Sequence, residues 1–181
     1  MDKLIYTVMT SAERTLHAQQ IRANNLANVD TNGFRADYEV TQSQVVPGYG
    51  YDARHQSNGS SEVVSQRTGA VKDTARDLDV AITGPGYLAV VHEGGEAYTR
   101  AGALQLDADG GVTLHGRAVL GDGGPIVLPP HRAVAIAHDG TISVLPEDGE
   151  EMQDVDRLKL VEGDAAMRKN KVGLLQALNG N

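Results

Sequence analysis

Residues 1–34 read MDKLIYTVMTSAERTLHAQQIRANNLANVDTNGF, and the rest of the chain is best understood in relation to this stretch. Its first 28 residues contain neither proline nor glycine. Apolar or small residues recur at alternating steps of four and three, with Gln19 as one polar member, which is the spacing of a helical seam. The seam residues are Ile5, Met9, Ala12, Leu16, Ala23 and Leu26. The pattern predicts one amphipathic helix, roughly 42 Å long at 1.5 Å per residue.

The two ends of this predicted helix carry their own signals. Asp2 is suited to cap the start, because its carboxylate can accept from free backbone N–H groups. Asn32-Gly33 is suited to close the end, because glycine adopts the left-handed conformation readily. Phe34 is the only phenylalanine of the chain, and we expect it to act as an apolar plug that fixes the direction of exit.

Asparagines crowd the last turns of the helix at Asn24, Asn25 and Asn28. Asparagine is a mediocre helix former, since its amide competes for backbone groups. An amide donates and accepts at once, so these side chains can bridge to a neighbouring helix or loop. A frayed helix end with solvated amides fits the spacing equally well.

The seam must be buried against something, because an amphipathic helix gains most of its stability from packing. The sequence contains no second long amphipathic helix to pair with it. Either the helix lies on the β-rich domain that follows, or its partner is another polypeptide. The second arrangement would make the protein a building block of an assembly.

Composition limits the possible partners. The chain has 181 residues, a formal net charge of −8 and no cysteine. The negative charge argues against nucleic acid or anionic lipid, and the lack of cysteine excludes disulfides. No apolar run approaches the ~20 residues of a membrane span, and the N-terminus does not have the layout of a cleaved secretory signal. We therefore expect no nucleic-acid partner and no membrane insertion.

The chain changes character twice after the helix, which gives three expected segments at 1–34, 35–76 and 77–181. Residues 35–76 are polar and rich in Ser, Gln and Thr, which predicts an extended linker or arm that could hold two short strands. Residues 77–181 show short apolar runs separated by turn sequences. This pattern is typical of an antiparallel barrel or sandwich. The expected fold is α+β and mainly β.

The apolar runs predict individual strands in the last segment. They include LDVAI at 78–82, YLAVV at 87–91 and IVL at 126–128. VGLLQALN at 172–179 is ambiguous between a strand and a helical turn.

No constellation of residues assembles into an active site. Six histidines are scattered without the spacing of a metal site. Asp107-Ala108-Asp109-Gly110 contains part of a calcium loop but lacks its other acidic positions, which favours a β-turn. Asp77 and Asp79 fit a turn cap better than a catalytic pair. We predict no catalytic, cofactor-binding or metal-ligating residue.

Four sequence blocks, taken in their order along the chain, resemble those of a known protein family. They are NNLANVDTNGFR (24–35), LDVAITGPGYLAV (78–90), YTRAGALQLDADGGVTLHGRAVLG (98–121) and IAHDGTISV (136–144). Together they resemble the bacterial flagellar axial proteins of the rod and hook. The opening MDKLIYTVMTSAERTL is most similar to the proximal rod members of that family.

The resemblance implies a non-catalytic subunit of a helical tube, the rod of the flagellar basal body that spans the periplasm. It implies assembly with itself and with other rod subunits, the helix lying in the inner tube and the β domain in the outer layer. It also implies export through the flagellar type III apparatus without a cleaved signal, and no cofactor. Carried over by position, the residues expected to serve assembly are Asn24, Asn25, Leu26, Ala27, Asn28, Gly33 and Phe34.

One departure from the family concerns the C-terminal side. Family members continue into a long amphipathic helix that pairs with the first one, whereas this sequence stops at Asn181. The resemblance therefore predicts a fragment, an isolated core or a naturally shortened variant.

Three alternatives to a proximal rod subunit remain. Another rod or hook paralogue would share the same blocks. A secreted enzyme acting on the cell wall would need a paired acid and base. A glycan-binding β module would need exposed aromatic side chains, and the chain has six tyrosines, three of them within 35–76.

Overall fold

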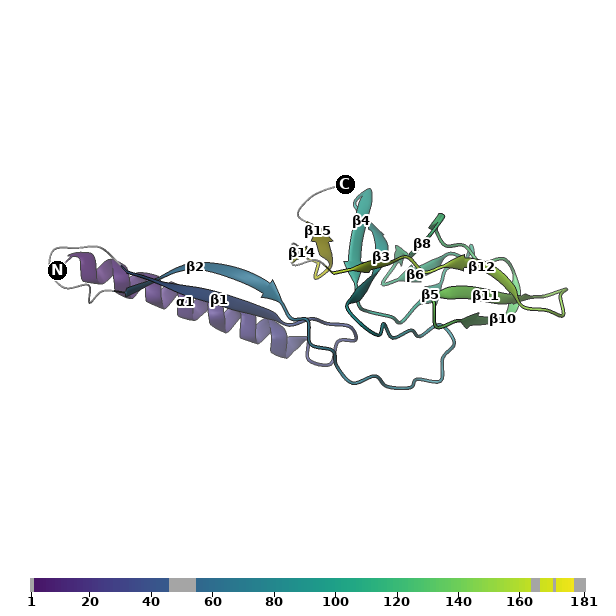
Figure 1. Cartoon of the computed structure of the whole chain (residues 1–181), viewed down its shortest axis with the longest axis horizontal. Coiled ribbons are helices and arrows are strands. Elements are labelled where there is room, and N and C mark those ends of the chain that lie inside the picture. The colour runs from purple at the N-terminus through teal and green to yellow at the C-terminus, as the bar shows by residue number, and fades with distance from the viewer. Residues whose placement is uncertain (1, 46–54, 164–166, 171, 178–181) are drawn as a thin grey trace. The chain divides into compact units, whose positions relative to one another are not determined.

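The computed structural model of the chain describes residues 2–45, 55–163, 167–170 and 172–177. It describes the backbone alone for residues 2–4, 7, 41–44 and 55–62. The described part is mainly β, with one N-terminal helix and antiparallel sheets (Figure 1). The described strands form small open sheets instead of a closed barrel. The predicted α+β, mainly β class is therefore confirmed.

Two compact units are interleaved along the sequence. The helix unit comprises residues 1–31 and 35–65, and the β unit comprises residues 32–34 and 66–181. The short turn 32–34 thus belongs to the β unit although helix-unit residues flank it on both sides. The chain passes from one unit to the other three times.

The helix unit holds one helix and one hairpin. Helix α1 (Asp2–Ala27) is followed by β1 (Asp37–Val45) and β2 (His55–Val64), which pair antiparallel. The absence of proline and glycine lets α1 run unbroken, as the seam pattern predicts. At the base of the hairpin the Ser65 N–H donates to the Ala36 carbonyl at 2.8 Å.

The expected arm at 35–76 differs from the structure. In place of two short strands, it contains strands of nine and ten residues that pair antiparallel, and its described residues 66–76 form no strand. The pairing is carried by backbone groups, which a polar composition does not reveal. A register shift at Thr41/Gln42 further weakens the alternation along the hairpin.

Short antiparallel strands build the β unit, and their bounds are β3 (Gly86–His92), β4 (Gly95–Thr99), β5 (Gln105–Leu106), β6 (Val112–Leu114), β7 (Arg117–Ala118), β8 (Leu120–Gly121), β9 (Gly124–Pro125), β10 (His131–Ile136), β11 (Thr141–Pro146), β12 (Gln153–Arg157), β13 (Leu160–Glu162), β14 (Met167–Lys169) and β15 (Leu175–Ala177). The five-stranded sheet has the order β13-β3-β4-β15-β14. Two three-stranded sheets have the orders β10-β11-β12 and β5-β6-β7, and β8 pairs with β9.

The predicted strand YLAVV at 87–91 lies within β3, but LDVAI at 78–82 and IVL at 126–128 are not regular strands. LDVAI makes one isolated bridge, between Asp79 and Ala103, and the Val80 N–H donates to the Gly102 carbonyl at 2.9 Å. Its apolar side chains are half-buried and pack against the core. The segment therefore covers the core and does not form a regular β-ladder. The ambiguous run at 172–179 contains the strand β15.

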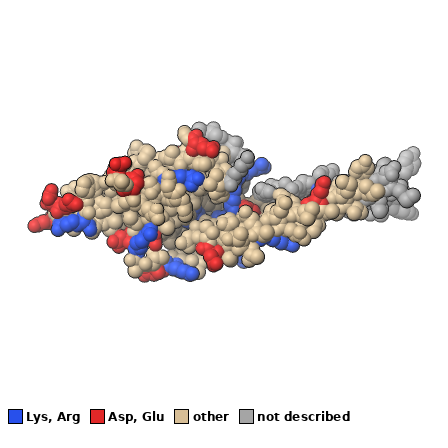
Figure 2. All heavy atoms as spheres, turned by 180° about the vertical axis from the view of Figure 1, so that it is seen from behind, with Lys and Arg blue, Asp and Glu red and all other residues tan. Residues whose placement is uncertain are grey.

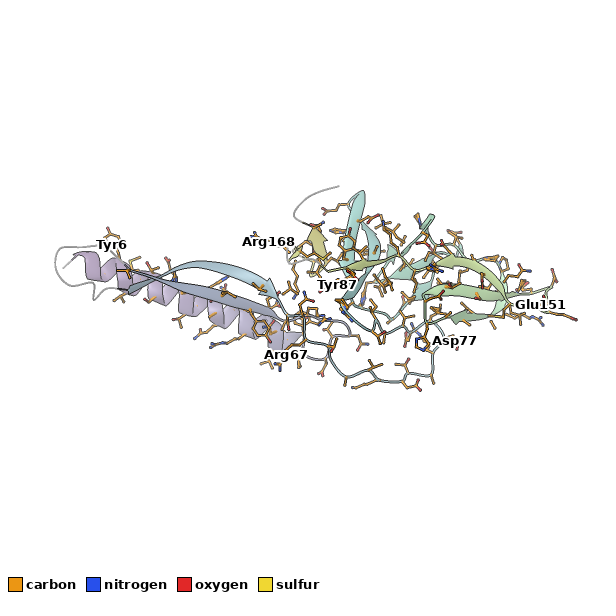
Figure 3. The ribbon with its side chains drawn as sticks, viewed as in Figure 1. Tyr6, Arg67, Asp77, Tyr87, Glu151 and Arg168 are labelled. Carbon is orange, nitrogen blue, oxygen red and sulfur yellow. The ribbon has the colours of Figure 1, made fainter. Side chains whose placement is uncertain are left out.

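The core of the β unit is formed by side chains from several sheets. Its largest fully buried members are Tyr87, Leu88, Leu104, Ile126 and Ile142. Figure 3 shows Tyr87 inside the body of this unit, whereas Glu151 lies at the tip of the β11–β12 hairpin.

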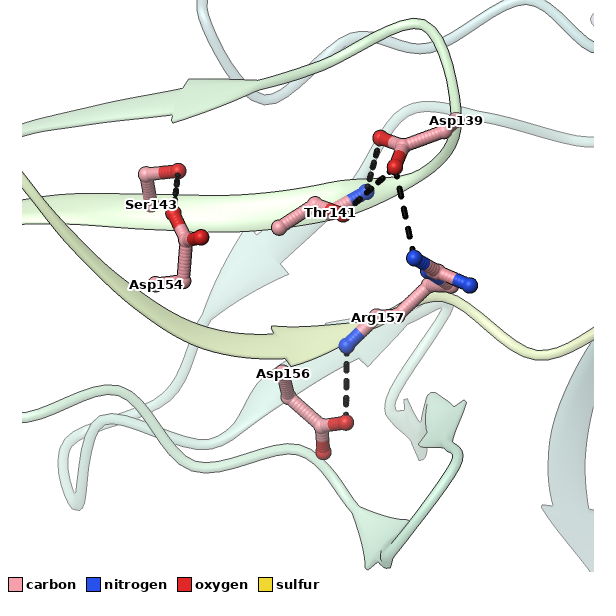
Figure 4. A network of polar contacts seen from close by, with 6 residues as sticks. All are labelled: Asp139, Thr141, Ser143, Asp154, Asp156 and Arg157. Atoms are coloured by element: carbon pink, nitrogen blue, oxygen red, sulfur yellow. Dashed lines mark hydrogen bonds and ion pairs between the residues drawn. The ribbon is translucent and has the colours of Figure 1, made fainter.

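A polar network fastens the three-stranded sheet β10-β11-β12 (Figure 4). The Ser143 hydroxyl on β11 donates to the Asp154 carboxylate on β12 at 2.7 Å. In the turn before β11, the Asp139 carboxylate accepts from the Thr141 N–H at 3.1 Å and from the Thr141 hydroxyl at 3.0 Å. Arg157 at the end of β12 lies 3.4 Å from the same carboxylate.

Candidate functional site

The predicted seam of α1 is exposed in the structure. Between 55 and 73% of the surface of its four large apolar residues is accessible: Ile5, Met9, Leu16 and Leu26. The smaller and polar positions of the row are exposed as well: Ala12, Gln19 and Ala23. Full burial of one large apolar side chain stabilises by about 1.5–3 kcal/mol, so an open row of four has a strong tendency to find a partner.

The opposite face of α1 is the one that the hairpin covers. The half-buried residues of the helix are Thr10, Arg14, His17, Ala18, Ile21 and Asn25. At 3.6 residues per turn, these positions lie about half a turn from the seam. β1 contacts α1, and a pair of hydrogen bonds joins Asn25 to the start of that strand. Neither arrangement expected for the helix included this hairpin, which packs on α1 and still leaves the seam open.

Charged side chains avoid the seam. The described ones on α1 are Glu13, Arg14 and Arg22, and all three lie roughly 80° or more from the centre of the seam. Figure 2 shows few charged side chains on the visible face of the helix unit. No helix in the described part of the chain is both long and apolar enough to cross a membrane.

Asn25 and Asn28 have defined partners within the helix unit. The Asn25 amide donates to the Asp37 carbonyl at 2.9 Å, and the Asp37 N–H donates to Asn25 Oδ1 at 3.0 Å. The Asn28 amide donates to the Asn24 carbonyl at 2.9 Å, and the Thr31 hydroxyl donates to Asn28 Oδ1 at 3.3 Å. The expected bridge from an amide to a neighbouring segment is therefore found at Asn25, while Asn28 closes the helix end.

The other residues of the expected assembly motif lie in two places. Leu26 and Ala27 are exposed at the end of α1. Gly33 has a φ of +73°, as expected, but it lies six residues beyond Ala27 and does not cap the helix. The helix closes earlier, since the Val29 N–H donates to the Leu26 carbonyl. Phe34 is half-buried in the β unit, with the Lys169 ammonium 4.2 Å from its ring centroid.

The sequence analysis missed an apolar outer face on the hairpin. Tyr38 and Val40 are both 48% exposed, and Val63, the cross-strand partner of Tyr38, is 46% exposed. They alternate with half-buried Asp37 and Glu39, so they lie on the face turned away from α1. The signal was present as the Asp-Tyr-Glu-Val alternation at 37–40.

The acidic residues that were considered as catalytic or calcium-binding groups take part in turns instead. Asp79 pairs with Arg76 at 2.8 Å, and Asp77 is exposed. The Asp107 carboxylate accepts from the Gly111 N–H at 2.6 Å and closes the predicted β-turn. Within the described residues, no group of three His, Cys, Asp or Glu side chains could hold a metal ion.

Comparison of the sequence with known protein families gives two matches. Residues 5–35, which contain the seam and the turn after the helix, match the family described as flagella basal body rod protein. Residues 81–144, which run from the LDVAI segment to β11, match the family described as flagellar hook protein FlgE/F/G D1 domain.

Individual relatives cover most of the chain. It is 41% identical over 165 residues to the flagellar basal-body rod protein FlgF of Escherichia coli, covering 90% of this chain and 66% of the relative. It is 40% identical over 175 residues to FlgF of Salmonella typhimurium, covering 94% of this chain and 70% of the relative. It is 30% identical over 190 residues to the flagellar basal-body rod protein FlgG of Bacillus subtilis, covering 96% of this chain and 72% of the relative.

Proposed function

Because the chain belongs to the flagellar basal-body rod protein family, we propose that it is a non-catalytic structural subunit of the bacterial flagellar rod, of the proximal type. The family resemblance carried by the four sequence blocks is thereby confirmed. In this proposal the subunit is exported through the flagellar type III apparatus, keeps its N-terminus and assembles where the rod crosses the periplasm.

The observation that carries the proposal is the open seam of α1. Its apolar row faces away from the hairpin of its own chain, and its charged neighbours lie to the sides. A seam spaced at steps of three and four is complementary to another helix of the same kind. The proposed partners are therefore the helices of further copies and of other rod subunits in a helical tube.

The residues at the end of α1 have a proposed share in this contact. Leu26 is the most exposed of the four large apolar residues of the seam, at 73%, and Asn24 and Ala27 beside it are exposed too. Asn25 and Asn28 would act indirectly, since their amides already fix the helix end and the start of β1. Gly33 and Phe34 would act through the β unit.

Leu16→Asp tests the seam. A carboxylate there would have to be buried without a partner, so we expect loss of incorporation into rods and loss of swimming while the purified subunit keeps its fold. Thr15→Asp is the matched control, because Thr15 is also exposed and lies about 100° around the helix from Leu16. Normal motility of the Leu16→Asp strain, with the variant present in basal bodies, would contradict the proposal.

Cross-linking separates a rod subunit from the alternatives. A photoreactive residue at Met9 should capture rod proteins in intact basal bodies, whereas the same residue at Arg22, off the seam, should capture far less. Capture of hook proteins alone would favour a hook paralogue. Turnover of purified peptidoglycan that one carboxylate substitution abolishes would replace the structural proposal with an enzymatic one.

A further inference from the structure

The turn 32–34 rests directly on the backbone of the β unit. With a φ of +73°, Gly33 adopts a conformation that other residues rarely take. A Cβ at this position would overlap with the carbonyl group of Arg100 and the nitrogen of Ala101. The peptide bond between Arg100 and Ala101 is therefore the surface on which the turn sits, and we call it the seat.

A second contact to the turn is made by the side chain of Lys169. The Lys169 ammonium lies over the Phe34 ring at 4.2 Å from the centroid, within the range of a cation–π interaction. Lys169 is the last residue of β14 and pairs with Leu175 of β15, which in turn pairs with Tyr98 of β4. Both contacts of the turn are thus connected to the end of β4: Arg100 follows the strand in sequence, and Lys169 is linked to it through β15.

The Arg100 side chain anchors that strand end. Its two terminal nitrogens donate to the Gly84 carbonyl at 2.6 Å and to the Ile82 carbonyl at 2.5 Å. Its guanidinium carbon lies 5.7 Å from the centroid of the buried Tyr87 ring. A planar fork can satisfy two carbonyls at once, which a lysine ammonium cannot do with the same geometry.

The segment that Arg100 grips is tied to the seat along its length. The Val80 N–H donates to the Gly102 carbonyl at 2.9 Å, and a Cβ on Gly102 would collide with the Val80 carbonyl. Residues 80–84 and 100–102 therefore run in close contact. If the fork were lost, the Arg100–Ala101 peptide would lose its side-chain link to residues 82–84 but would keep the bond from the Ala101 N–H to the Thr99 hydroxyl.

We infer that Arg100 is the positioning residue for the turn 32–34: its side chain does not carry the turn, but it fixes the peptide on which Gly33 rests and so keeps Phe34 under Lys169. This role concerns the β unit alone and does not depend on assembly into a rod. It also gives the arginine of the Tyr-Thr-Arg block at 98–100 a physical task.

The single phenylalanine makes this inference directly measurable. Incorporation of 4-fluorophenylalanine into the full chain places one fluorine label, at Phe34. In the unchanged protein its ¹⁹F resonance should be shifted from that of the free amino acid, because the ring lies against Lys169. Lys169→Met removes the ammonium and should move this resonance, which shows that the label reports the turn.

Arg100→Met and Arg100→Lys are the decisive variants. Both remove the forked pair of hydrogen bonds. We therefore expect the fraction of molecules in which the turn 32–34 has left the seat to rise by about tenfold or more, and the ¹⁹F resonance to move towards that of the free amino acid. Arg132→Met is the matched control, because Arg132 also donates to a carbonyl of the β unit, that of Gly149 at 2.6 Å, but from β10. It should leave the resonance in place.

Amide spectra of the same samples show whether the β unit remains folded. A folded Arg100→Lys variant whose ¹⁹F resonance stays at the original position would overturn the inference. Loss of the folded β unit in both Arg100 variants would overturn it too, since Arg100 would then support the whole unit and not the turn.

Discussion

At the scale of single residues, the Asp139 side chain shows how one carboxylate organises a turn. The N–H and the hydroxyl of Thr141 both donate to it, and Arg157 lies nearby (Figure 4). The Thr141 N–H is the largest cause that lowers the pKa of Asp139, followed by the Thr141 hydroxyl. The ionised form is thus favoured in the folded chain.

This lowered pKa has a defined pH consequence. Because the folded pKa lies below the unfolded value of about 3.9, the contribution of Asp139 to stability is present above that value and is lost as the pH falls through the folded pKa. Thr141→Val should raise the Asp139 pKa only part of the way, since the backbone donor remains. Carboxyl NMR titration measures it, with Ser143→Ala, which removes the hydroxyl bond to Asp154, as the control. An unchanged Asp139 pKa in Thr141→Val would contradict the assignment.

The backbone conformation of Gly33 could be predicted from the sequence, but the contact that requires a glycine there could not. The Asn-Gly pair indicated a positive φ, and the structure has one. The sequence suggested a helix cap, whereas the close approach of Arg100 and Ala101 comes from residues about 70 positions away along the chain. Local pattern carries no information on such a non-local contact.

At the scale of elements, the seam of α1 was predictable because a period of 3.5 is visible in a single sequence. The hairpin was not, because in the described part of β1 the polar Asp37 and Glu39 are half-buried, whereas Tyr38 and Val40 point outwards. This is the reverse of the usual arrangement, in which the apolar face of a strand is covered. The composition therefore suggested an extended arm, although the backbone of this segment forms a β-ladder.

The attachment of the hairpin to α1 depends on the Asn25 amide. Asn25→Ala removes both hydrogen bonds to Asp37, so we expect a loss of roughly 1–3 kcal/mol of local stability at the start of β1. Hydrogen exchange should become faster at residues 37–40 and across the ladder in β2. Asn24→Ala, at an exposed neighbouring position, is the control. Equal exchange rates in Asn25→Ala and the unchanged protein would show that the amide bridge does not hold the strand.

At the scale of the whole molecule, the β class and the position of the apolar runs were evident from the sequence. The interleaving of the two units was not, because it depends on the turn 32–34 joining residues that follow much later. LDVAI at 78–82 shows the same limit: its apolar pattern predicts burial correctly and strand pairing wrongly.

The core of the β unit can be tested apart from the helix. Leu104 is fully buried among residues that all come from position 78 onwards. Leu104→Ala should destabilise this unit by about 2–5 kcal/mol through lost burial and a cavity. Leu106→Ala, two residues later and 37% exposed, should have an effect below about 1 kcal/mol. Denaturation followed by the near-ultraviolet signal of the tyrosines measures both, and equal effects would contradict the assigned core.

The threefold passage of the chain between its two units has a mechanical consequence. Three peptide connections, at 31–32, 34–35 and 65–66, join bodies that a single linker could have joined. If the chain is a rod subunit as proposed, a torque applied between its two units is carried by three covalent connections. One cut by a protease within the hairpin segment would leave both fragments anchored in the subunit.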